Sequence, residues 1–396
     1  MNIILAHNFY SSKQPSGENE VVWSEKKLLE KNGNVVNMFS RHSDDLNEKH
    51  LSGKIRGAIC TPWNISTTGE IRRRIAETSA EVVHVHNTFP LISPSIFYGV
   101  GDRAAKVLTL HNYRLFCSAA IPMRDGRVCV ECLEKRTSIP ALKHGCYRGS
   151  RLSTVPLAAN IALHRFAKTW KNKVDAFIVL SEFQKSVMID AGLPREKVFV
   201  KPNFYSGRPK VIPWGDREPC VVFAGRLSRE KGIISLIDAW KIWGKKAPLL
   251  KVVGDGPLND KVRNYADGLN IEFYGRLSQS DTVELISNAK LQILPSEWFE
   301  GFPMVVREAF AFGTPSAVSN IGPLPSIVSH GTSGIVFEPS NPTSIHKMVA
   351  KCWEDDGLLK HMGENARLEF ESKYTEESNY ETLLEVYRSA IQISKR

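Results

Sequence analysis

Short apolar runs alternate with amphipathic helical patterns along the whole of this 396-residue chain. The spacing of Val21, Leu28 and Leu29, or of Ile234, Ile237 and Trp240, is helical. Short apolar runs that alternate with helices favour an α/β architecture with parallel sheets. The expected strands form two groups, at residues 2–6, 35–39, 82–85, 106–110, 176–180 and 197–200, and at residues 220–224, 249–253, 271–274, 291–294, 316–318 and 335–337.

Each half of the chain opens in the same way, with an apolar strand, a glycine-bearing loop and a helix. Gly17 follows the first strand, and Gly225 and Gly232 follow the strand that opens the second half. A chain of this length is too long for one ordinary core. We therefore expect two Rossmann-like domains in tandem, with a cleft between the carboxyl ends of their sheets. The expected domains are residues 1–205 and 206–375, joined within the Pro- and Gly-bearing stretch 203–219 and followed by a helix over 376–396.

Composition limits the class of protein. Apolar residues make up 42% of the chain, as in soluble globular proteins. No apolar run approaches the roughly 18 residues that span a bilayer. The apolar start of the chain is too short for a signal peptide and has no basic residues before it, so a cytoplasmic protein is expected. Seven cysteines do not indicate a disulfide scaffold.

The segment 300–315 sets two carboxylates around the start of a predicted helix. Pro303 suits the first helical position and Gly313 suits the stop. Glu300 then lies in the preceding loop, and Glu308 lies more than a turn inside the helix. The loop and first turn supply N–H groups for an anion, from Gly301, Phe302, Met304 and Val305.

A carboxylate beside an anion site indicates a ligand with an anionic end and a hydroxyl-rich end, as in a nucleotide-sugar. The alternative is a strand–loop–helix unit with two surface glutamates. The spacing Glu300, seven residues, Glu308, preceded by Pro-Ser and followed by Gly-Thr-Pro, resembles the donor-site signature of retaining glycosyltransferases of family 4. The resemblance implies a GT-B fold, in which Glu300 touches the donor sugar and Glu308 holds the ribose hydroxyls. It also implies that the helix 376–396 crosses back to the first domain.

A second motif, residues 225–232, follows a strand and precedes a helix, the context of a phosphate loop. Arg226 offers a bidentate grip on phosphate oxygens, and Lys231 acts as a point charge. Fixed cations stabilise a departing diphosphate more in the transition state than in the ground state. The resemblance implies that these two residues hold the donor diphosphate; the alternative is a solvated basic turn.

Three further residues correspond to weaker family positions. Gly17 lies where the family has a glycine-rich loop that approaches the donor phosphate, although Ser16 replaces the first of the two usual glycines. Arg276 follows a strand at a turn that meets the nucleotide base. His111 ends a strand at the position that the family places near the donor sugar or the acceptor. For His84, a hydrogen-bonded structural role is the better interpretation.

A cluster of cysteines follows His111, at Cys117, Cys129, Cys132 and Cys146. The C-x2-C pair followed by a further cysteine is typical of zinc sites. A zinc ion with four thiolates would be structural, because no coordination position stays open. Free thiols packed under the loop, or two disulfides, are the alternatives.

The net charge of +10 is concentrated in the first half. Residues 1–205 hold 29 Lys and Arg against 18 Asp and Glu, whereas residues 206–396 hold 23 against 24. A helical pattern over 155–171 places Ala158, Ala162, Phe166 and Trp170 on one side and Arg165, Lys168 and Lys171 on another. Such a helix could lie on an anionic membrane surface; the alternative is an ordinary helix with its apolar side inward. No nucleic-acid-binding signature is present.

Together with the resemblance, these features predict a glycosyltransferase that moves a sugar from a UDP- or GDP-sugar to a hydroxyl of a lipid-linked or oligosaccharide acceptor, in surface polysaccharide assembly. The resemblance implies that the transfer retains the anomeric configuration of the sugar. Two routes lead to retention. A double displacement needs a carboxylate on the far face of the sugar, and no residue is compelling for that role. A front-face route needs only positioning and charge stabilisation and is favoured. No Asp-x-Asp motif is present, so no catalytic cofactor is expected. The alternatives are an NDP-sugar epimerase, hydrolase or phosphorylase on the same scaffold, or a non-catalytic nucleotide-sugar-binding partner.

Overall fold

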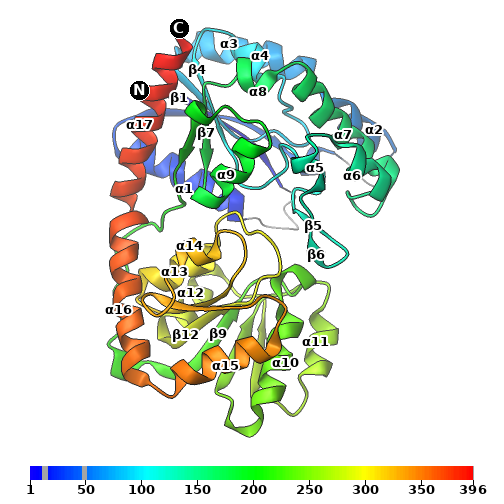
Figure 1. Ribbon diagram of the computed structural model, residues 1–396. Helices are drawn as coiled ribbons and strands as arrows, with labels where there is room; N and C mark the ends of the chain where they lie inside the picture. Colours follow the sequence, from blue (N-terminus) through cyan, green and yellow to red (C-terminus); the bar gives the residue numbers. More distant parts are fainter. Residues whose placement is uncertain (11–16, 47–50, 396) are drawn as a thin grey trace. The chain divides into compact units, whose positions relative to one another are not determined.

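The computed structural model describes residues 1–10, 17–46 and 51–395. The chain divides into two compact units (Figure 1). The first unit comprises Met1–Pro122, Val130–Asn203 and Asn379–Arg396, and the second comprises Met123–Cys129 and Phe204–Ser378. Each unit is an α/β assembly around its own six-stranded parallel sheet.

The sheet of the first unit has the strand order β2-β1-β3-β4-β7-β8, with all pairings parallel. Its strands are β1 (Asn2–Phe9), β2 (Val35–His42), β3 (Val82–Asn87), β4 (Ala105–Thr109), β7 (Ala176–Val179) and β8 (Val198–Val200). The helices of this unit are α1 (Gly17–Lys31), α2 (Leu51–Cys60), α3 (Ile65–Thr78), α4 (Ile96–Val100), α5 (Glu131–Glu134), α6 (Ile139–His144), α7 (Arg151–Phe166), α8 (Thr169–Asn172), α9 (Glu182–Asp190) and most of α17 (Glu376–Ser394), with the 3-10 turns η1 (Ser43–Asp45) and η2 (Arg195–Lys197).

The central strands of this sheet are buried on both faces, as expected for a parallel sheet with helices on each side. One face packs against the C-terminal helix α17. Leu383, Val386 and Tyr387 of α17 join a single core cluster with strand residues such as Ile3 and Val82. The last helix of the chain is therefore part of the core of the first unit.

The sheet of the second unit has the order β11-β10-β9-β12-β13-β14 and is also entirely parallel. Its strands are β9 (Glu218–Ala224), β10 (Leu249–Val253), β11 (Ile271–Gly275), β12 (Ala289–Leu294), β13 (Ser316–Ser319) and β14 (Gly334–Phe337). The helices are α10 (Ile233–Trp243), α11 (Asn259–Tyr265), α12 (Gln279–Asn288), α13 (Met304–Ala311), α14 (Leu324–Ile327), α15 (Pro342–Trp353) and α16 (Asp356–Lys373), with η3 (Trp214–Asp216), η4 (Arg229–Lys231) and η5 (Gly244–Lys246).

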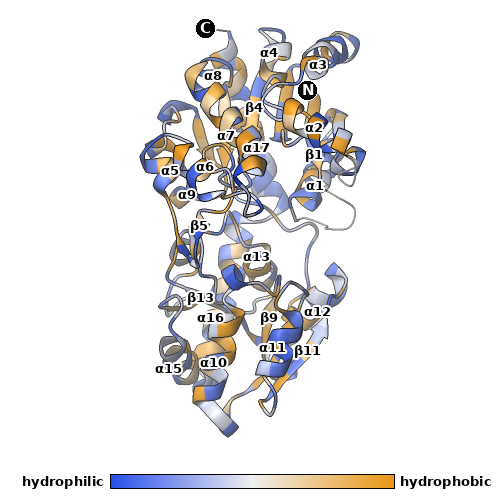
Figure 2. Ribbon diagram, turned by 90° about the vertical axis from the view of Figure 1, so that its right-hand side faces the viewer, coloured by the Kyte–Doolittle hydropathy of each residue, from blue (hydrophilic) through white to orange (hydrophobic). Residues whose placement is uncertain are grey.

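The period-2 alternation of strand side chains divides the core of the second unit between the two faces of its sheet. Val221 and Phe223 face a cluster that includes Trp240 of α10, whereas Val222 faces a cluster that includes Ala309 of α13. Apolar positions line α10 in Figure 2, as this burial requires. The strand order reverses between β9 and β12, and ligands of such folds bind at the carboxyl ends of strands at this reversal.

The predicted fold class is confirmed, and each of the twelve predicted strands has its counterpart in the two sheets. The hairpin of β5 (Met123–Arg124) and β6 (Arg127–Val128) was not predicted. Its strands are too short to give a periodic pattern, but its turn residues, Asp125 and Gly126, are a strong hairpin signal and have φ values of 52° and 77°.

Two predicted helix boundaries were wrong. Pro303 is not the first helical residue; it caps α13 with an extended backbone, at φ −74° and ψ 109°. The helix expected over 155–171 is two helices, α7 and α8, because Lys168 adopts a left-handed φ of 50°. The expected faces of this segment also differ: Ala158 and Trp170 are buried, whereas Phe166 is 88% exposed. In the described part of the chain, no helix is both long and apolar enough to cross a bilayer.

Candidate functional site

Two loops at the carboxyl ends of neighbouring strands form the candidate site of the second unit. Residues 225–232 follow β9, and residues 295–303 follow β12. Since β9 and β12 pair in parallel at the strand-order reversal, both loops emerge at the same edge of the sheet.

Backbone contacts hold these two loops together. The Glu297 N–H donates to the Glu230 carbonyl over 2.9 Å. Gly232 ends the turn η4 at a left-handed φ of 69°, and a Cβ built there would lie 1.8 Å from the Pro295 carbonyl oxygen. Only glycine fits this close approach. Lys231, the last residue of η4, is therefore fixed against the loop that contains Glu300.

Three donors converge on one oxygen of Glu300. The Lys231 ammonium lies 2.7 Å from Oε1, the Ser296 hydroxyl donates over 2.5 Å, and the Trp298 indole N–H donates over 3.1 Å. The Glu300 side chain is 6% exposed and that of Lys231 is 21% exposed. The carboxylate is thus held in one orientation at the mouth of the site, as a residue that positions a ligand requires.

The remaining groups around these loops favour an anion. The Arg226 side chain is exposed and makes no hydrogen bond or ion pair with the described residues. The N–H groups of Gly301 and Phe302 likewise donate to no acceptor in the described part of the chain. Pro303, at the N-cap of α13, has no side-chain group that could cap the helix. One guanidinium, one ammonium and backbone N–H groups at a helix start are suited to phosphate oxygens.

Glu308 lies inside α13 and is buried. Its Oε1 lies 3.3 Å from both Gln279 Nε2 and Arg307 Nη2. Burial raises the pKa of Glu308, although Arg307 opposes that shift. Arg276 is exposed directly after β11. The structure therefore brings Lys231 and Glu300 into contact, but it shows no contact of Glu308 or Arg276 with either.

The glycines of the 253–257 segment have a packing explanation. Cβ atoms built on Gly254 and Gly256 would lie 1.9 Å from the Gly225 carbonyl oxygen and 2.4 Å from the Leu227 carbonyl oxygen. These glycines let the turn after β10 lie directly on the loop after β9. They support the loop that contains Arg226 and need no ligand to account for them.

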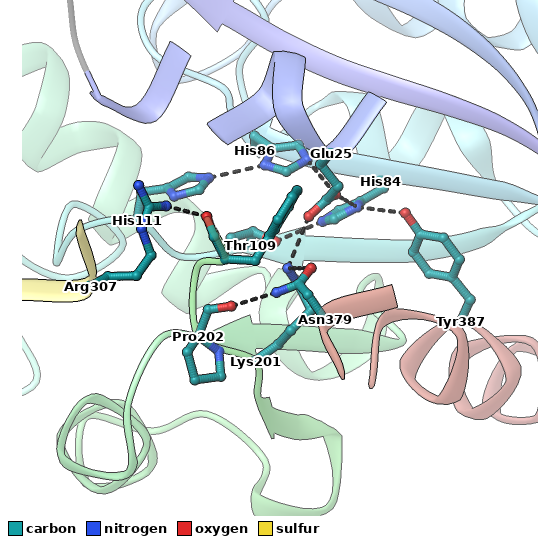
Figure 3. Close-up of polar contacts among 11 residues, drawn as sticks. Glu25, His84, His86, Thr109, His111, Lys201, Pro202, Arg307, Asn379 and Tyr387 are labelled. Atoms are coloured by element: carbon teal, nitrogen blue, oxygen red, sulfur yellow. Dashed lines mark hydrogen bonds and ion pairs between the residues drawn. The ribbon is translucent and has the colours of Figure 1, made fainter. Parts of the chain in front are cut away.

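In the first unit, the half-buried His111 lies at the end of a buried chain of polar side chains (Figure 3). His111 Nε2 lies 3.0 Å from His86 Nδ1, and the two rings stack with centroids 5.3 Å apart. His86 Nε2 in turn lies 3.2 Å from Glu25 Oε1. Burial lowers the pKa of His111 well below its usual range and lowers that of His86 to about 4. Both imidazoles are therefore neutral at neutral pH.

Glu25 and Lys201 form a buried ion pair at the other end of this chain. Their side chains are 1% and 2% exposed, and Lys201 Nζ lies 3.0 Å from Glu25 Oε2. Burial alone would raise the pKa of Glu25, but Lys201, His84 and His86 together lower it well below its usual value. Lys201 Nζ also donates to Asn379 of α17 over 3.2 Å.

His84 is a structural residue of the same network. Its Nδ1 lies 2.8 Å from the Tyr387 hydroxyl and its Nε2 lies 2.7 Å from the Thr109 hydroxyl. Among the residues that the structure describes, Glu25, His84 and His86 form the one group of three potential metal ligands within 4.8 Å of one another. Lys201 already neutralises Glu25, so a divalent ion would leave uncompensated positive charge in the core.

The four clustered cysteines form no such group within the described residues. None of the seven cysteines, all of which lie in the described residues, forms a disulfide; Cys117 and Cys132 are buried, whereas Cys129 and Cys146 are half-buried. Burial raises the pKa of Cys117 to about 12. The raised pKa favours the protonated thiol, whereas a zinc ion binds the deprotonated thiolate. Structural zinc at these residues stays a prediction.

Sequence reasoning missed several residues of these two networks. Ser296 and Trp298 lie next to Glu300 in the sequence, and their polar groups were the available signal. Glu25 and Lys201 gave no local signal, because they lie 176 residues apart and meet only in the folded unit. Gly17 is the exposed first residue of α1, and Ser16 lies outside the described residues.

Comparison with known proteins agrees with this fold. The family described as Glycosyltransferase Family 4 matches residues 15–206, and that described as Glycosyl transferases group 1 matches residues 208–369. Together these matches account for most of both units. The chain belongs to glycosyltransferase family 4, the group 1 glycosyltransferases, and has the GT-B fold.

Two curated relatives match about half of the chain. The chain is 31% identical over 186 residues to an uncharacterized glycosyltransferase of Methanocaldococcus jannaschii, and the match covers 46% of this chain and 47% of the relative. It is 31% identical over 210 residues to an exopolysaccharide phosphotransferase of Streptomyces coelicolor, covering 49% of this chain and 21% of that protein. The chain thus spans about half or less of the length of these relatives.

Solved structures match over nearly the whole chain at low identity. Sucrose-phosphate synthase from Thermosynechococcus elongatus superposes with a TM-score of 0.71 at 16% identity, covering 99% of each chain. HepE from Anabaena, in complex with UDP and glucose, gives a TM-score of 0.64 at 16% identity, covering 98% of this chain and 100% of HepE. At this identity the likeness establishes the fold.

Proposed function

We propose that this protein is a retaining glycosyltransferase that moves a sugar from a nucleoside-diphosphate sugar to an acceptor hydroxyl. One observation carries the proposal: Lys231 and Glu300 meet at the carboxyl ends of β9 and β12, beside the start of α13. This arrangement offers positive charge to a diphosphate and a fixed carboxylate to sugar hydroxyls at the place where Rossmann-like units bind ligands.

In this proposal, Arg226 and Lys231 hold the donor diphosphate, and the N–H groups of Gly301, Phe302 and Met304 line the same anion site. Negative charge grows on the diphosphate as the bond to the sugar breaks. Fixed cations and oriented N–H groups stabilise that charge more in the transition state than in the ground state. Lys231 would then share its charge between Glu300 and the phosphate oxygens.

The carboxylates and the remaining residues position the donor. Glu300 accepts from sugar hydroxyls, Glu308 holds the ribose hydroxyls, and Arg276 lies beside the base; Gly17 permits close approach of the backbone to the phosphate. His111 is neutral, because burial lowers its pKa well below the usual range. It therefore offers a neutral imidazole to the donor sugar or the acceptor. Retention of the anomeric configuration by a front-face route is consistent with this set of groups.

The proposed acceptor is a hydroxyl of a lipid-linked or oligosaccharide chain, and the proposed pathway is surface polysaccharide assembly. The similarity to an exopolysaccharide phosphotransferase supports this choice, and HepE, which was solved with UDP and glucose, supports a UDP-sugar as the first donor to test. We propose that the protein acts in the cytoplasm or at the inner face of the cytoplasmic membrane.

A thermal-shift screen of UDP-, GDP- and ADP-sugars tests donor binding, because a ligand that binds only the folded state raises the melting temperature. One donor should raise the melting temperature of the wild type and of Lys261→Ala, which removes an exposed lysine of α11, but not that of Lys231→Ala. Proton NMR of the product should show the donor's anomeric configuration. An equal shift for Lys231→Ala, or turnover of the donor to an epimer, would refute the proposal.

A further inference from the structure

Helix α7 has two apolar faces, of which only one is used for packing. The inward face consists of Thr154, Leu157, Ala158, Ile161 and His164. His164 is fixed at both ring nitrogens, with Nδ1 2.9 Å from the Thr169 hydroxyl and Nε2 3.0 Å from the Pro62 carbonyl oxygen. The helix is therefore anchored in the first unit without any contribution from its other face.

The other face is exposed and has no polar residue along its centre. Leu152 and Phe166, at its two ends, are 84% and 88% exposed, and Val155 and Leu163 are 49% and 38% exposed. Ala159 and Ala162 between them are also exposed. The spacing places these side chains along one side of the helix. We name the following residues the outer stripe of α7: Leu152, Val155, Ala159, Ala162, Leu163 and Phe166.

Positive charge lies at both ends of the outer stripe. Residues 135–174 contain nine Lys and Arg and no Asp or Glu. Lys143 and Arg151 are exposed at one end, where Arg151 Nε donates to the Lys143 carbonyl over 3.0 Å. Lys168 and Lys171 are exposed at the other end. In the described part of the chain, none of these four residues forms an ion pair with a carboxylate.

We propose that the outer stripe of α7 and these four cations dock on an anionic lipid bilayer. Apolar side chains enter the boundary between headgroups and acyl chains, and Lys and Arg beside them contact anionic headgroups. The charge decides between this occupant and a second copy of the chain. Two copies joined through this face would bring like charges together, which opposes association. A bilayer with anionic lipids supplies the complementary charge.

This inference deepens the proposed location at the membrane, and it rests on exposure and charge in the first unit and not on the donor site. Binding to lipid is measured without any nucleotide-sugar, so its failure would leave the transferase proposal standing. Conversely, a protein that binds vesicles but turns over no donor would retain the surface and lose the proposed activity.

The test is vesicle co-sedimentation of the full chain. One set of vesicles contains phosphatidylcholine with about one-third phosphatidylglycerol, and the other contains phosphatidylcholine alone. We expect binding to the anionic vesicles that weakens at high salt, since exposed charges are screened. The variant Leu152→Asp/Phe166→Asp should lower the partition coefficient at least about tenfold, and Lys168→Glu/Lys171→Glu should lower it on anionic vesicles only.

Leu368→Asp is the matched control, because Leu368 is an apolar side chain of α16 that is 61% exposed and lies in the other unit. Its binding should equal that of the wild type, and circular dichroism should show that every variant is folded. Absence of wild-type binding, or equal binding by Leu152→Asp/Phe166→Asp, would overturn the proposal. Self-association of the wild type in light scattering that this variant abolishes would assign the stripe to a second copy instead.

Discussion

The buried pair of Glu25 and Lys201 allows a quantitative prediction about stability. Its side chains are almost fully buried, so water cannot solvate either charge when the other is removed. Removing one member of such a pair typically costs about 3–5 kcal/mol, because the other charge stays buried and unpaired. Lys201→Met leaves the Glu25 carboxylate without its ammonium partner, and Glu25→Gln leaves the Lys201 ammonium with the Asn379 amide oxygen.

Each single variant should therefore lower the free energy of unfolding of the first unit by about 3–5 kcal/mol. The double variant Glu25→Gln/Lys201→Met removes both charges. Its loss of unfolding free energy should be about 3 kcal/mol smaller than the sum of the losses in the two single variants. Additivity of the two changes would show that the charges do not depend on each other in the folded unit.

Hydrogen exchange followed by mass spectrometry is the suitable assay, because a chain of two units does not guarantee a two-state transition. Peptides that contain β3, whose His84 and His86 contact Glu25, should lose protection in each single variant. Peptides that contain β10 of the second unit serve as an internal control and should keep theirs. Single variants that exchange at the wild-type rate in β3 would refute the claim that this pair is desolvated.

Three further predictions concern the two networks. Lys231→Ala should lower kcat/KM by roughly 100- to 1,000-fold with little change in melting temperature, as measured by donor consumption; a change in stability alone would contradict the assigned role. Gly232→Ala should destabilise the second unit, since its Cβ would clash with the Pro295 carbonyl, and a wild-type melting temperature would contradict this. The pKa of His86 is about 4 in the folded state, against an unfolded value near 6.5, so the free energy of unfolding should fall as pH drops from about 6.5 to about 4. In pH-dependent denaturation, His86→Asn should show a shallower slope than the wild type. Equal slopes would contradict the pKa shift.

A chelator experiment tests the expected lack of a catalytic cofactor. Since the chain has no Asp-x-Asp motif, transferase activity should persist in EDTA. Loss of activity that magnesium or manganese restores would contradict the prediction. Metal analysis of the purified protein would show in the same experiment whether the four clustered cysteines hold zinc.

The sequence by itself determined the strands and the class of fold. Runs such as residues 220–224 are apolar at every position, and a strand buried on both faces requires this wherever the rest of the chain lies. The spacing of Glu300 and Glu308 likewise identified the family, because a loop followed by a helix start fixes both residues by local geometry. Short elements without a period, such as the β5–β6 hairpin, gave too little pattern to predict.

Tertiary structure decided which distant residues meet. The contact of Lys231 with Glu300 depends on the parallel pairing of β9 with β12, and the pair of Glu25 and Lys201 depends on packing within the first unit. The two apolar faces of α7 also look alike in the sequence. Only the neighbours of the helix distinguish the buried Ile161 from the exposed Phe166, because burial is a property of what packs against a residue and not of the residue itself.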